Sequence, residues 1–440
     1  MRLLLKNSIS KIGIYLPFII SGGFILWMIF HYGVNTPFWD QWSMVPLLQK
    51  MYNHTLSFFN LWHQYNEHRI FFPLVFLMVS AYFTHWNIFF ELIINFCFAV
   101  FTATLLALLL KKSFSRQILP IIASVFASLW FFSPIQWENW LWGWQLEWFM
   151  CVFGAIAAIF LIMKQSDSIN GRKNALFSLA ILSGIVSSYS LSSGIVVWLV
   201  GLFELVFLKQ SRKYIFTWLG SGLIATFLYY YHYVFPVKGD RLTISFFVHH
   251  IIGFVGFFLT YLGSPVGLQG SYGAMYIGGL IFIILLPIIY FVWMDRVMLK
   301  KYLPWLSLAL FSILSGLTIT VGRLFLGISE ALASRYTTIS VIYIISITIL
   351  GLLLLDDEHI RKKIKIISVS TILIVSTVFL ILSYTVGISG FSGRSLALQN
   401  IKSCTRKINP NDNCLVMTYP FPDIIRPELS FLKQKHLAGY

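Results

Sequence analysis

An aspartate stands among aromatic residues directly after the first long apolar stretch of the chain. In NTPFWDQWSMVP, residues 35–46, Asp40 follows Trp39 and precedes Gln41 and Trp42, and the two tryptophans are candidate substrate-binding residues. Tryptophan commonly lies where a membrane segment meets water, whereas an ionisable group near lipid is costly unless it faces a cavity or a partner. Asp40 is therefore a candidate general base for a substrate hydroxyl at the membrane surface; the alternative is a solvated loop carboxylate.

Three later stretches concentrate polar and ionisable side chains of the same kind. They are WHQYNEHRIFFP, IQWENWLWGWQLEW and GRLFLGISEALASRY. A carboxylate in them can act as an acid or base, an arginine can bind phosphate through its planar fork of donors, and an amide or imidazole can orient a substrate. The candidates are Glu67, His68, Arg69, Glu138, Asn139, Gln145, Glu147, Arg323, Glu330 and Arg335.

Helical spacing relates some of these side chains to one another. Glu138 and Gln145 are seven residues apart and would share one face of a helix, whereas Glu147 would point to the opposite side. Arg323 and Glu330 are also seven residues apart and could pair if that stretch is helical, whereas Arg335 would point elsewhere. The two glutamates of the second stretch are therefore not predicted to form an acid/base pair on one helix.

Each candidate also has a structural interpretation that stays open. Glu138 can pair within a helix bundle, and Glu67 can form a local salt bridge with Arg69. Arg323 and Arg335 can be structural partners of Glu330. The tryptophans of the second stretch are predicted first as a belt at the membrane surface and second as a wall on which a sugar or lipid stacks. These are Trp137, Trp140, Trp142, Trp144 and Trp148.

Motifs for other chemistries are missing from the sequence. There is no P-loop, dinucleotide fingerprint, nucleophile elbow or zinc-ligand spacing. His63 and His68 are five residues apart and do not share a helical face, so no metal site is predicted and a divalent metal is not favoured.

The elements that must position the candidates are membrane helices. Of 440 residues, 58% are hydrophobic and 11% are charged, and the mean hydropathy is +0.78. Apolar runs of about 20 residues, the length that crosses a bilayer, recur along the chain. We therefore predict an all-α, polytopic membrane protein. The net charge of +16 is assigned to membrane orientation and not to nucleic-acid binding.

Short basic loops set the predicted topology, because such loops stay in the cytoplasm. With six of them inside, the N-terminus is cytoplasmic, the first outer loop covers 33–85, and the C-terminal tail lies outside the cytoplasmic membrane. The eleven expected spans are 14–32, 86–110, 117–134, 144–163, 174–188, 195–208, 214–235, 273–294, 302–320, 336–355 and 366–388. The apolar stretches 70–84 and 245–262 do not fit as spans and are expected to be interfacial or re-entrant helices.

The tail differs in composition from the rest of the chain. Residues 389–440 are polar and rich in turn residues, so they are predicted as a small extracytoplasmic region that caps a transmembrane domain of residues 1–388. Cys404 and Cys414, ten residues apart in this tail, would form a disulfide in an oxidising compartment.

The long first outer loop, with an acidic residue close behind the first helix and interfacial helices after it, resembles the glycosyltransferase C superfamily. The size and small tail are most similar to bacterial serotype-converting glucosyltransferases of the inner membrane. The resemblance implies an inverting transfer of one sugar, such as glucose, from a polyprenyl-phosphate donor to a cell-surface glycan such as the O-antigen of lipopolysaccharide. It implies that Asp40 is the base.

The resemblance is incomplete at one position. The superfamily commonly has a paired acidic motif, whereas here Gln41 follows Asp40, so Glu67 and Glu138 compete as the second carboxylate. Membrane lipid, the polyprenyl-phosphate sugar and a glycan acceptor are the expected partners. Arg323 and Arg335, with Lys238 and Arg241 as further candidates, are expected to bind the phosphate. The alternatives are a flippase or transporter of lipid-linked oligosaccharide and an O-antigen-type polymerase.

Overall fold

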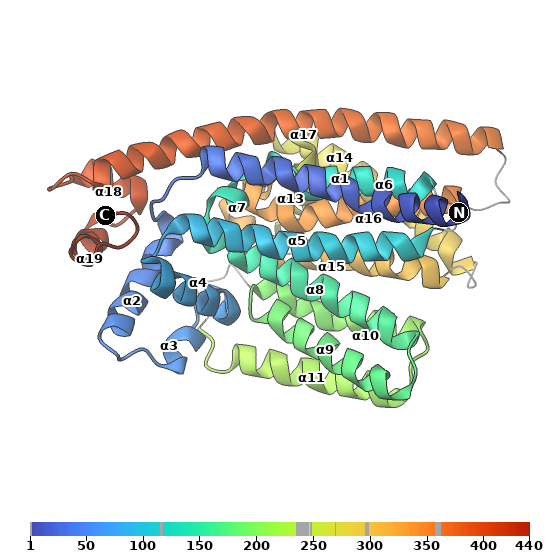
Figure 1. Cartoon of the computed structure of the whole chain (residues 1–440), viewed down its shortest axis with the longest axis horizontal. Helices are drawn as coiled ribbons and strands as arrows, with labels where there is room; N and C mark the ends of the chain where they lie inside the picture. The colour runs from blue at the N-terminus through green and yellow to red at the C-terminus, as the bar shows by residue number, and fades with distance from the viewer. Residues whose placement is uncertain are drawn as a thin grey trace.

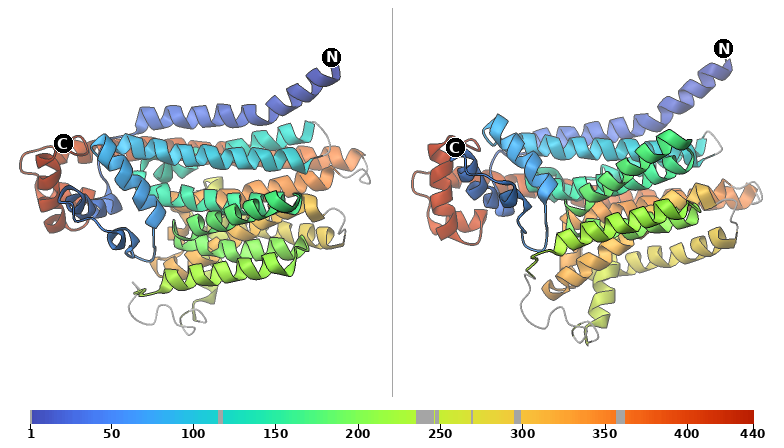
Figure 2. Two further views of the ribbon diagram at one scale, coloured as in Figure 1. Left: turned by 60° about the horizontal axis from the view of Figure 1, so that its bottom comes forward. Right: turned by 90° about the horizontal axis from the view of Figure 1, so that it is seen from below.

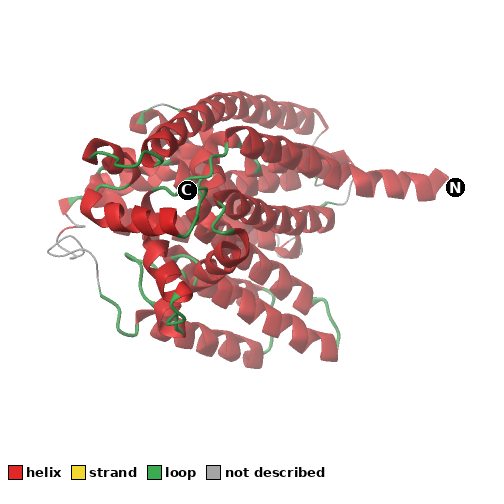
Figure 3. Ribbon diagram, turned by 60° about the vertical axis from the view of Figure 1, so that its left-hand side comes forward, coloured by secondary structure: helices red, strands yellow, loops and turns green. Residues whose placement is uncertain are grey.

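A computed structural model describes residues 2–114, 118–234, 246, 249–268, 270–294, 299–356 and 362–440. Helices make up nearly all of this part of the chain, and Figure 3 shows no strand in it. The long helices lie side by side along the longest axis of the molecule (Figure 1). The α-helices are α1 (Arg2–Tyr32), α2 (Val45–Tyr52), α3 (Phe58–Trp62), α4 (Phe71–Thr84), α5 (Ile88–Ser113), α6 (Ile118–Phe131), α7 (Trp137–Leu141), α8 (Leu146–Ser166), α9 (Asn170–Ser188), α10 (Val197–Phe207), α11 (Arg212–Tyr230), α13 (Ile251–Gly263), α14 (Ser271–Met294), α15 (Leu299–Arg323), α16 (Thr337–Leu355), α17 (Lys362–Thr405), α18 (Asp412–Thr418) and α19 (Pro422–Gln434).

The helix lengths and composition confirm an all-α polytopic membrane protein. Eight helical segments within the described residues are long and apolar enough to cross a membrane. They are Gly13–Tyr32, Ile88–Ser113, Ile118–Leu141, Gly143–Ser166, Ser271–Val292, Leu299–Leu326, Ser334–Leu355 and Ser370–Thr405. The expected spans 174–188, 195–208 and 214–235 correspond to α9, α10 and α11, which are not among the eight. The count of eleven therefore stays a prediction.

The two short apolar stretches form the short helices α4 and α13. They have 14 and 13 residues. At 1.5 Å per residue each is about 20 Å long, which is shorter than the hydrocarbon thickness of about 30 Å. Their length fits the expectation that neither crosses the bilayer alone.

The first loop and the C-terminal tail lie together at one end of the helix bundle. In Figure 1, α2 and α3 lie at the same end of the bundle as α18 and α19, and in Figure 2 the blue first loop lies beside the red C-terminal segment, with the N-terminus at the opposite end. The ring centroids of Tyr52 on α2 and Phe431 on α19 are 6.2 Å apart, and the Ala438 amide donates to the His85 carbonyl over 3.0 Å. We call residues 406–440 the C-terminal cap.

The helix that leads into this cap is longer than expected. α17 continues to Thr405 and does not end at residue 388. A disulfide joins Cys404, in its last turn, to Cys414 of α18, with 5.9 Å between the Cα atoms. The bond anchors the start of the cap to the end of α17.

The predicted tryptophan belt is wrong. Trp140, Trp144 and Trp148 are buried, with exposed fractions of 0%, 2% and 4%. The segment that carries them forms the 3₁₀ turn η2 (Pro134–Gln136), the short helix α7 and the 3₁₀ turn η3 (Gly143–Gln145). Both α7 and η3 contact α5, and α7 contacts η2 and η3. Because these turns fold the segment into the bundle, its indoles pack against protein, as Trp140 does against Phe149 at 4.8 Å between ring centroids.

Candidate active site

Asp40 lies at the end of the bundle where the first loop and the cap meet. It belongs to the 3₁₀ turn η1 (Trp39–Met44), which begins with Trp39 at a φ of 46°. The Tyr65 hydroxyl donates to Asp40 Oδ1 over 2.8 Å, and Ser43 Oγ donates to the Tyr65 oxygen over 3.1 Å. The first loop therefore supplies a carboxylate with its own hydrogen-bond donor.

A buried carboxylate explains why glutamine follows this aspartate. Gln41 Nε2 donates to Glu91 Oε2 over 2.6 Å, and Trp86 Nε1 donates to Glu91 Oε1 over 2.8 Å. A Cβ at Gly143 would lie 2.0 Å from Glu91 Oε2, so only glycine fits against this carboxylate. Gln41 thus holds η1 to α5, a role that an acid in its place would fill poorly because two carboxylates would meet.

A tight turn brings Tyr65 and His68 together. The two residues exchange backbone hydrogen bonds of 2.8 Å, and Asn66 between them has a φ of 48°, which asparagine tolerates better than most residues. His68 Nδ1 accepts from the Ser192 amide over 3.3 Å, and His68 Nε2 lies 3.4 Å from Glu67 Oε1. An accepting Nδ1 carries no proton, so the neutral ring has its proton on Nε2.

The surroundings of Asp40 weaken its tendency to ionise. Burial raises the pKa of Asp40 above its ordinary value, and the Tyr65 hydrogen bond and the charges of Arg335 and Arg323 oppose that rise in part. Burial lowers the pKa of His68, which keeps the imidazole neutral, although Glu147 opposes this shift. Burial raises the pKa of Tyr65, so its hydroxyl remains protonated and can donate. A raised carboxylate pKa is typical of a general base.

Replacing Tyr65 by phenylalanine should move the pH dependence of activity. Tyr65→Phe removes a donor that stabilises the Asp40 carboxylate, so the pKa of Asp40 rises further and the acidic limb of the pH–rate profile moves to higher pH. On that limb we expect a rate about tenfold below wild type, because a hydrogen bond to a charged group is worth about 1.5–3 kcal/mol. Tyr82→Phe, on the exposed Tyr82 of α4, is the control. An unmoved limb would contradict the assignment of the base.

Glu67 and Arg323 form a partly exposed ion pair beside His68. Arg323 Nη2 donates to Glu67 Oε1, and the side chains are 31% and 26% exposed. Glu67 therefore pairs with Arg323 and not with Arg69 as a local salt bridge. A small cavity of about 40 Å³ lies beside this pair, lined also by His68, Ser192 and Tyr336. It is large enough for water but not for a sugar ring.

Glu330 pairs with Arg335, one of its two possible structural partners, and not with Arg323. Glu330 accepts hydrogen bonds from Arg335 Nη2 and, over 3.0 Å, from the Tyr336 hydroxyl. The segment is not one helix but three 3₁₀ turns, η7 (Leu324–Leu326), η8 (Ile328–Leu332) and η9 (Ser334–Tyr336). Gly327, at a φ of 95°, breaks the helical path between η7 and η8, so a seven-residue spacing no longer places two side chains on one face.

Glu138 is held between two arginines. Its Oε1 accepts from Arg394 Nη2 over 3.0 Å, and its Oε2 accepts from the Arg335 amide over 3.0 Å, with Arg335 Nη1 at 3.7 Å. Both oxygens are engaged and the side chain is 11% exposed. This geometry favours the structural interpretation of Glu138 over a role as a base.

Sequence reasoning missed Arg394, because it lies in a tail that was expected to be only a cap. Its guanidinium carbon lies 4.4 Å from the ring centroid of Phe38, 5.1 Å from Trp137 and 5.9 Å from Trp142. Aromatic faces attract a cation, so this cage and Glu138 hold Arg394 in place. Tyr65 was missed too, and a tyrosine on a two-residue turn gives no sequence signal.

The remaining predicted binding residues contribute mainly to the framework. Arg69 is 5% exposed and donates to the carbonyls of Trp62, Tyr229 and Tyr231, which joins the first loop to the end of α11. Asn139 Nδ2 donates to the Arg335 carbonyl over 2.9 Å. Three further predicted binding residues differ in exposure. Gln145 and Trp42 are buried, whereas Trp39 is 42% exposed.

The cap places one side chain, Tyr419, within electrostatic reach of Asp40. The negative charge of Asp40 acts on the half-buried Tyr419, whose pKa rises through burial and through the charges of Asp40 and Glu428. Burial raises the pKa of Glu428 to about 7. The charge of Asp40 therefore acts on a side chain of the cap.

Among the described residues, no group of three or more His, Cys, Asp or Glu side chains could hold a metal ion. The further phosphate-binding candidates Lys238 and Arg241 lie outside the described residues.

No protein-family model matches the chain, and no curated protein matches it. The functional argument therefore depends on the membrane fold and on the geometry of this site.

Proposed function

We propose that the chain is a membrane glycosyltransferase that moves one sugar from a polyprenyl-phosphate donor to a cell-surface glycan, with inversion at the anomeric carbon. The observation that carries this proposal is Asp40, a largely buried carboxylate that lies in the electrostatic reach of Arg323 and Arg335 at one end of a membrane bundle. A base next to cations is the combination that sugar transfer from a phosphate requires.

In the proposed reaction, the acceptor hydroxyl attacks the anomeric carbon from the side opposite the phosphate. Asp40 takes the hydroxyl proton as the new carbon–oxygen bond forms. The bond between the sugar and the phosphate oxygen breaks, and the polyprenyl phosphate leaves with that electron pair. Tyr65 positions the Asp40 carboxylate through its hydrogen bond, and the Arg323 guanidinium offsets the charge that develops on the phosphate.

Binding of the donor requires a change at the Glu67–Arg323 pair. The cavity beside the pair is too small for a sugar, and Arg323 is already paired. An ion pair that is partly exposed contributes about 1 kcal/mol or less, so a donor phosphate can take the place of Glu67 at small cost. We infer that phosphate binding separates the pair and opens the space for the sugar.

Substitution of Glu67 separates two roles for this residue. If Glu67 only competes with the phosphate, Glu67→Gln should tighten binding of polyprenyl phosphate about fivefold, the effect of removing one exposed ion pair. Titration of the purified protein measures this affinity. Asp412→Asn, which breaks the exposed Asp412–Arg426 pair on the cap, should leave it unchanged. Unchanged binding with a large fall in turnover would instead make Glu67 the second catalytic carboxylate.

The proposal is tested by direct transfer. Membranes that contain the protein are given polyprenyl-phosphate glucose with a radiolabelled sugar and a lipid-linked O-antigen acceptor, and label in the glycan is measured. We expect label only with the polyprenyl-phosphate donor, and inverted anomeric configuration in the product. Labelling from a nucleotide sugar in its absence, or no label with a panel of polyprenyl-phosphate hexoses, would contradict the proposal.

The distribution of charge favours this function over transport of a lipid-linked glycan. Transport predicts ionisable side chains along a path through the bilayer. The ion pairs of Glu67, Glu138 and Glu330 instead gather at the end of the bundle that carries the first loop and the cap. A polymerase would use the same base and arginines, and the acceptor used in the transfer assay distinguishes it.

A further inference from the structure

Trp39 has an exposed side chain on the turn that carries the proposed base. It precedes Asp40 at the start of η1 and is 42% exposed, whereas Gln41 and Trp42 of the same turn are buried. Its ring contacts that of Phe38, with 6.2 Å between the ring centroids. A large part of the indole is therefore open to a ligand next to the carboxylate.

The backbone of Trp39 adopts an unfavourable conformation. Its φ of 46° lies in the left-handed region, where a bulky residue is strained and glycine is not. The flanking residues hold it there: Gln41 Oε1 accepts from the Phe38 amide over 3.2 Å, and the Phe38 carbonyl accepts from Trp142 Nε1 over 3.1 Å. Such strain is concentrated at active sites and ligand clamps. A ligand explains a tryptophan at this position better than the stability of the turn does.

A sugar ring suits an exposed indole beside a base. One face of a sugar ring carries C–H groups that stack on an aromatic face, while its hydroxyls reach polar groups at the edge. In the proposed inverting transfer, the acceptor hydroxyl approaches from the side opposite the phosphate, and Asp40 takes its proton. A surface next to Asp40 on the same turn therefore belongs to the acceptor, whereas the phosphate lies with Arg323.

The cap has aromatic side chains near the same carboxylate. The charge of Asp40 acts on Tyr419, and the ring centroid of Tyr419 lies 5.7 Å from that of Phe421. Phe421 is 59% exposed, so this pair also presents an open aromatic surface. The first loop and the cap thus both supply aromatic side chains, which suits a glycan of more than one sugar.

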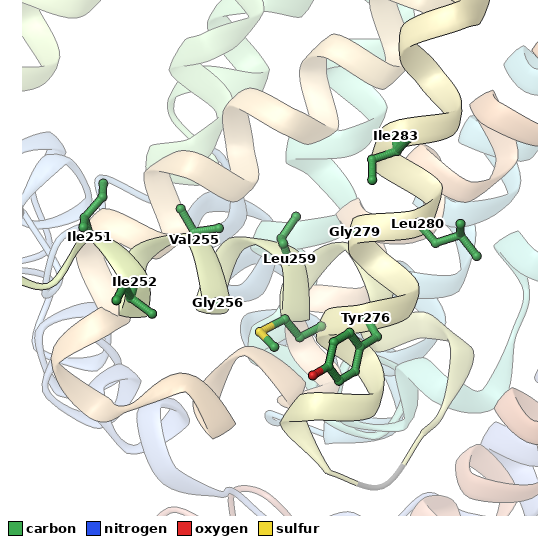
Figure 4. Close-up of a pocket in the computed structure, with 10 residues that line it drawn as sticks. Ile251, Ile252, Val255, Gly256, Leu259, Tyr276, Gly279, Leu280 and Ile283 are labelled. Atoms are coloured by element: carbon green, nitrogen blue, oxygen red, sulfur yellow. The ribbon is translucent and has the colours of Figure 1, made fainter.

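The apolar groove between α13 and α14 has different walls (Figure 4). Its volume is about 650 Å³, but its side chains are aliphatic apart from those of Met275 and Tyr276, and none of its lining residues belongs to the candidate site. The hydroxyls of a glycan would find few partners there, and burying them without hydrogen bonds is unfavourable. The turn of Asp40 is the better surface for a glycan.

We propose that Trp39 is the stacking platform for the acceptor glycan and places its reacting hydroxyl at Asp40. The assignment rests on the proposed function and names the acceptor subsite of that site. Trp39 contacts the sugar and takes no part in the bond changes. Tyr419 and Phe421 of the cap contact further sugars of the same glycan.

Binding of soluble oligosaccharides tests the subsite without the reaction. A panel of O-antigen oligosaccharides is titrated into the full-length protein in nanodiscs that contain no polyprenyl phosphate. Trp39→Ala should weaken binding about tenfold, and Trp39→Tyr, which keeps an aromatic face, should stay within about threefold of wild type. Trp27→Ala is the control, because Trp27 is a similarly exposed tryptophan on the membrane helix α1 and should leave binding unchanged. Equal affinity of wild type and Trp39→Ala, or no binding of any oligosaccharide to wild type, would overturn the proposal.

Glycine at the same position separates stacking from a structural role. Trp39→Gly relieves the positive φ, so the midpoint of thermal unfolding should not fall, while the affinity for the oligosaccharide should fall as it does in Trp39→Ala. A midpoint several degrees below that of wild type would show that the indole holds the turn together, and would overturn the proposal.

The transfer assay distinguishes this subsite from the function on which it rests. In Trp39→Ala the KM for the acceptor should rise about tenfold, while the KM for the polyprenyl-phosphate sugar should stay within about twofold of wild type. An equal rise of both KM values would overturn the acceptor assignment and leave the proposed function standing. Oligosaccharide binding that depends on Trp39, without any sugar transfer, would leave the subsite standing and remove the proposed function.

Discussion

Replacing Asp40 by asparagine should reduce sugar transfer by about a thousandfold, because general acid–base catalysis contributes about 10²–10⁴ in rate and an amide cannot accept the hydroxyl proton. Asparagine has nearly the same size, and the Tyr65 hydroxyl can still donate to its carbonyl oxygen. The variant should therefore fold and bind polyprenyl phosphate as wild type does. Initial rates of transfer in membranes, normalised to folded protein, measure the loss.

The control for this loss is Asp423→Asn. Asp423 is an exposed carboxylate in the first turn of α19 and lies in the cap without being assigned to the site. Transfer should stay within about twofold of wild type in this variant, as for most surface changes. If Asp40→Asn retained a rate within about threefold of wild type, the base would have to be another residue.

Removal of the Arg394 charge should destabilise the protein more than removal of any exposed charge. Arg394→Met keeps an apolar chain against Phe38, Trp137 and Trp142 but leaves Glu138 Oε1 without its arginine. Breaking a buried pair costs about 3–5 kcal/mol. Because Arg335 still contacts the other oxygen of Glu138, we expect the lower end of that range. The midpoint of thermal unfolding in detergent should fall by several degrees.

Two further variants show whether the effect comes from this pair. Arg426→Met breaks an ion pair whose side chains are 51% and 70% exposed, and it should change stability by less than about 1 kcal/mol. The double variant Glu138→Gln, Arg394→Met should recover part of the lost stability, since no buried charge then lacks a partner. A double variant as unstable as the sum of the single ones would contradict the coupling.

Helix positions and membrane character could be predicted because both follow from local composition. The expected spans 86–110 and 336–355 agree closely with α5 and α16, since a run of apolar residues forms a helix wherever it lies in the bilayer. The same local reasoning was wrong for the tryptophans of residues 137–148. Whether an indole meets lipid or protein depends on the turns that fold its segment, and the sequence pattern does not encode them.

The ion pairs of the candidate site could not be predicted from the sequence either, for a related reason. The Glu67–Arg323 and Glu138–Arg394 pairs each join residues 256 positions apart, and every carboxylate of the site had several arginines available. Helical periodicity relates only residues a few turns apart. The seven-residue spacing from Arg323 to Glu330 did not give a pair, because Gly327 interrupts the helix between them.

Three features could be predicted before the fold was known: an all-α membrane protein, an acidic residue directly after the first apolar helix, and two cysteines placed to bond in the tail. These features depend on residue type and short-range spacing. The hydrogen bond from Tyr65 to Asp40 and the two contacts that hold Glu138, from Arg394 and Arg335, appear only once the chain is folded. Those contacts depend on how distant helices pack, and packing is a property of the whole chain.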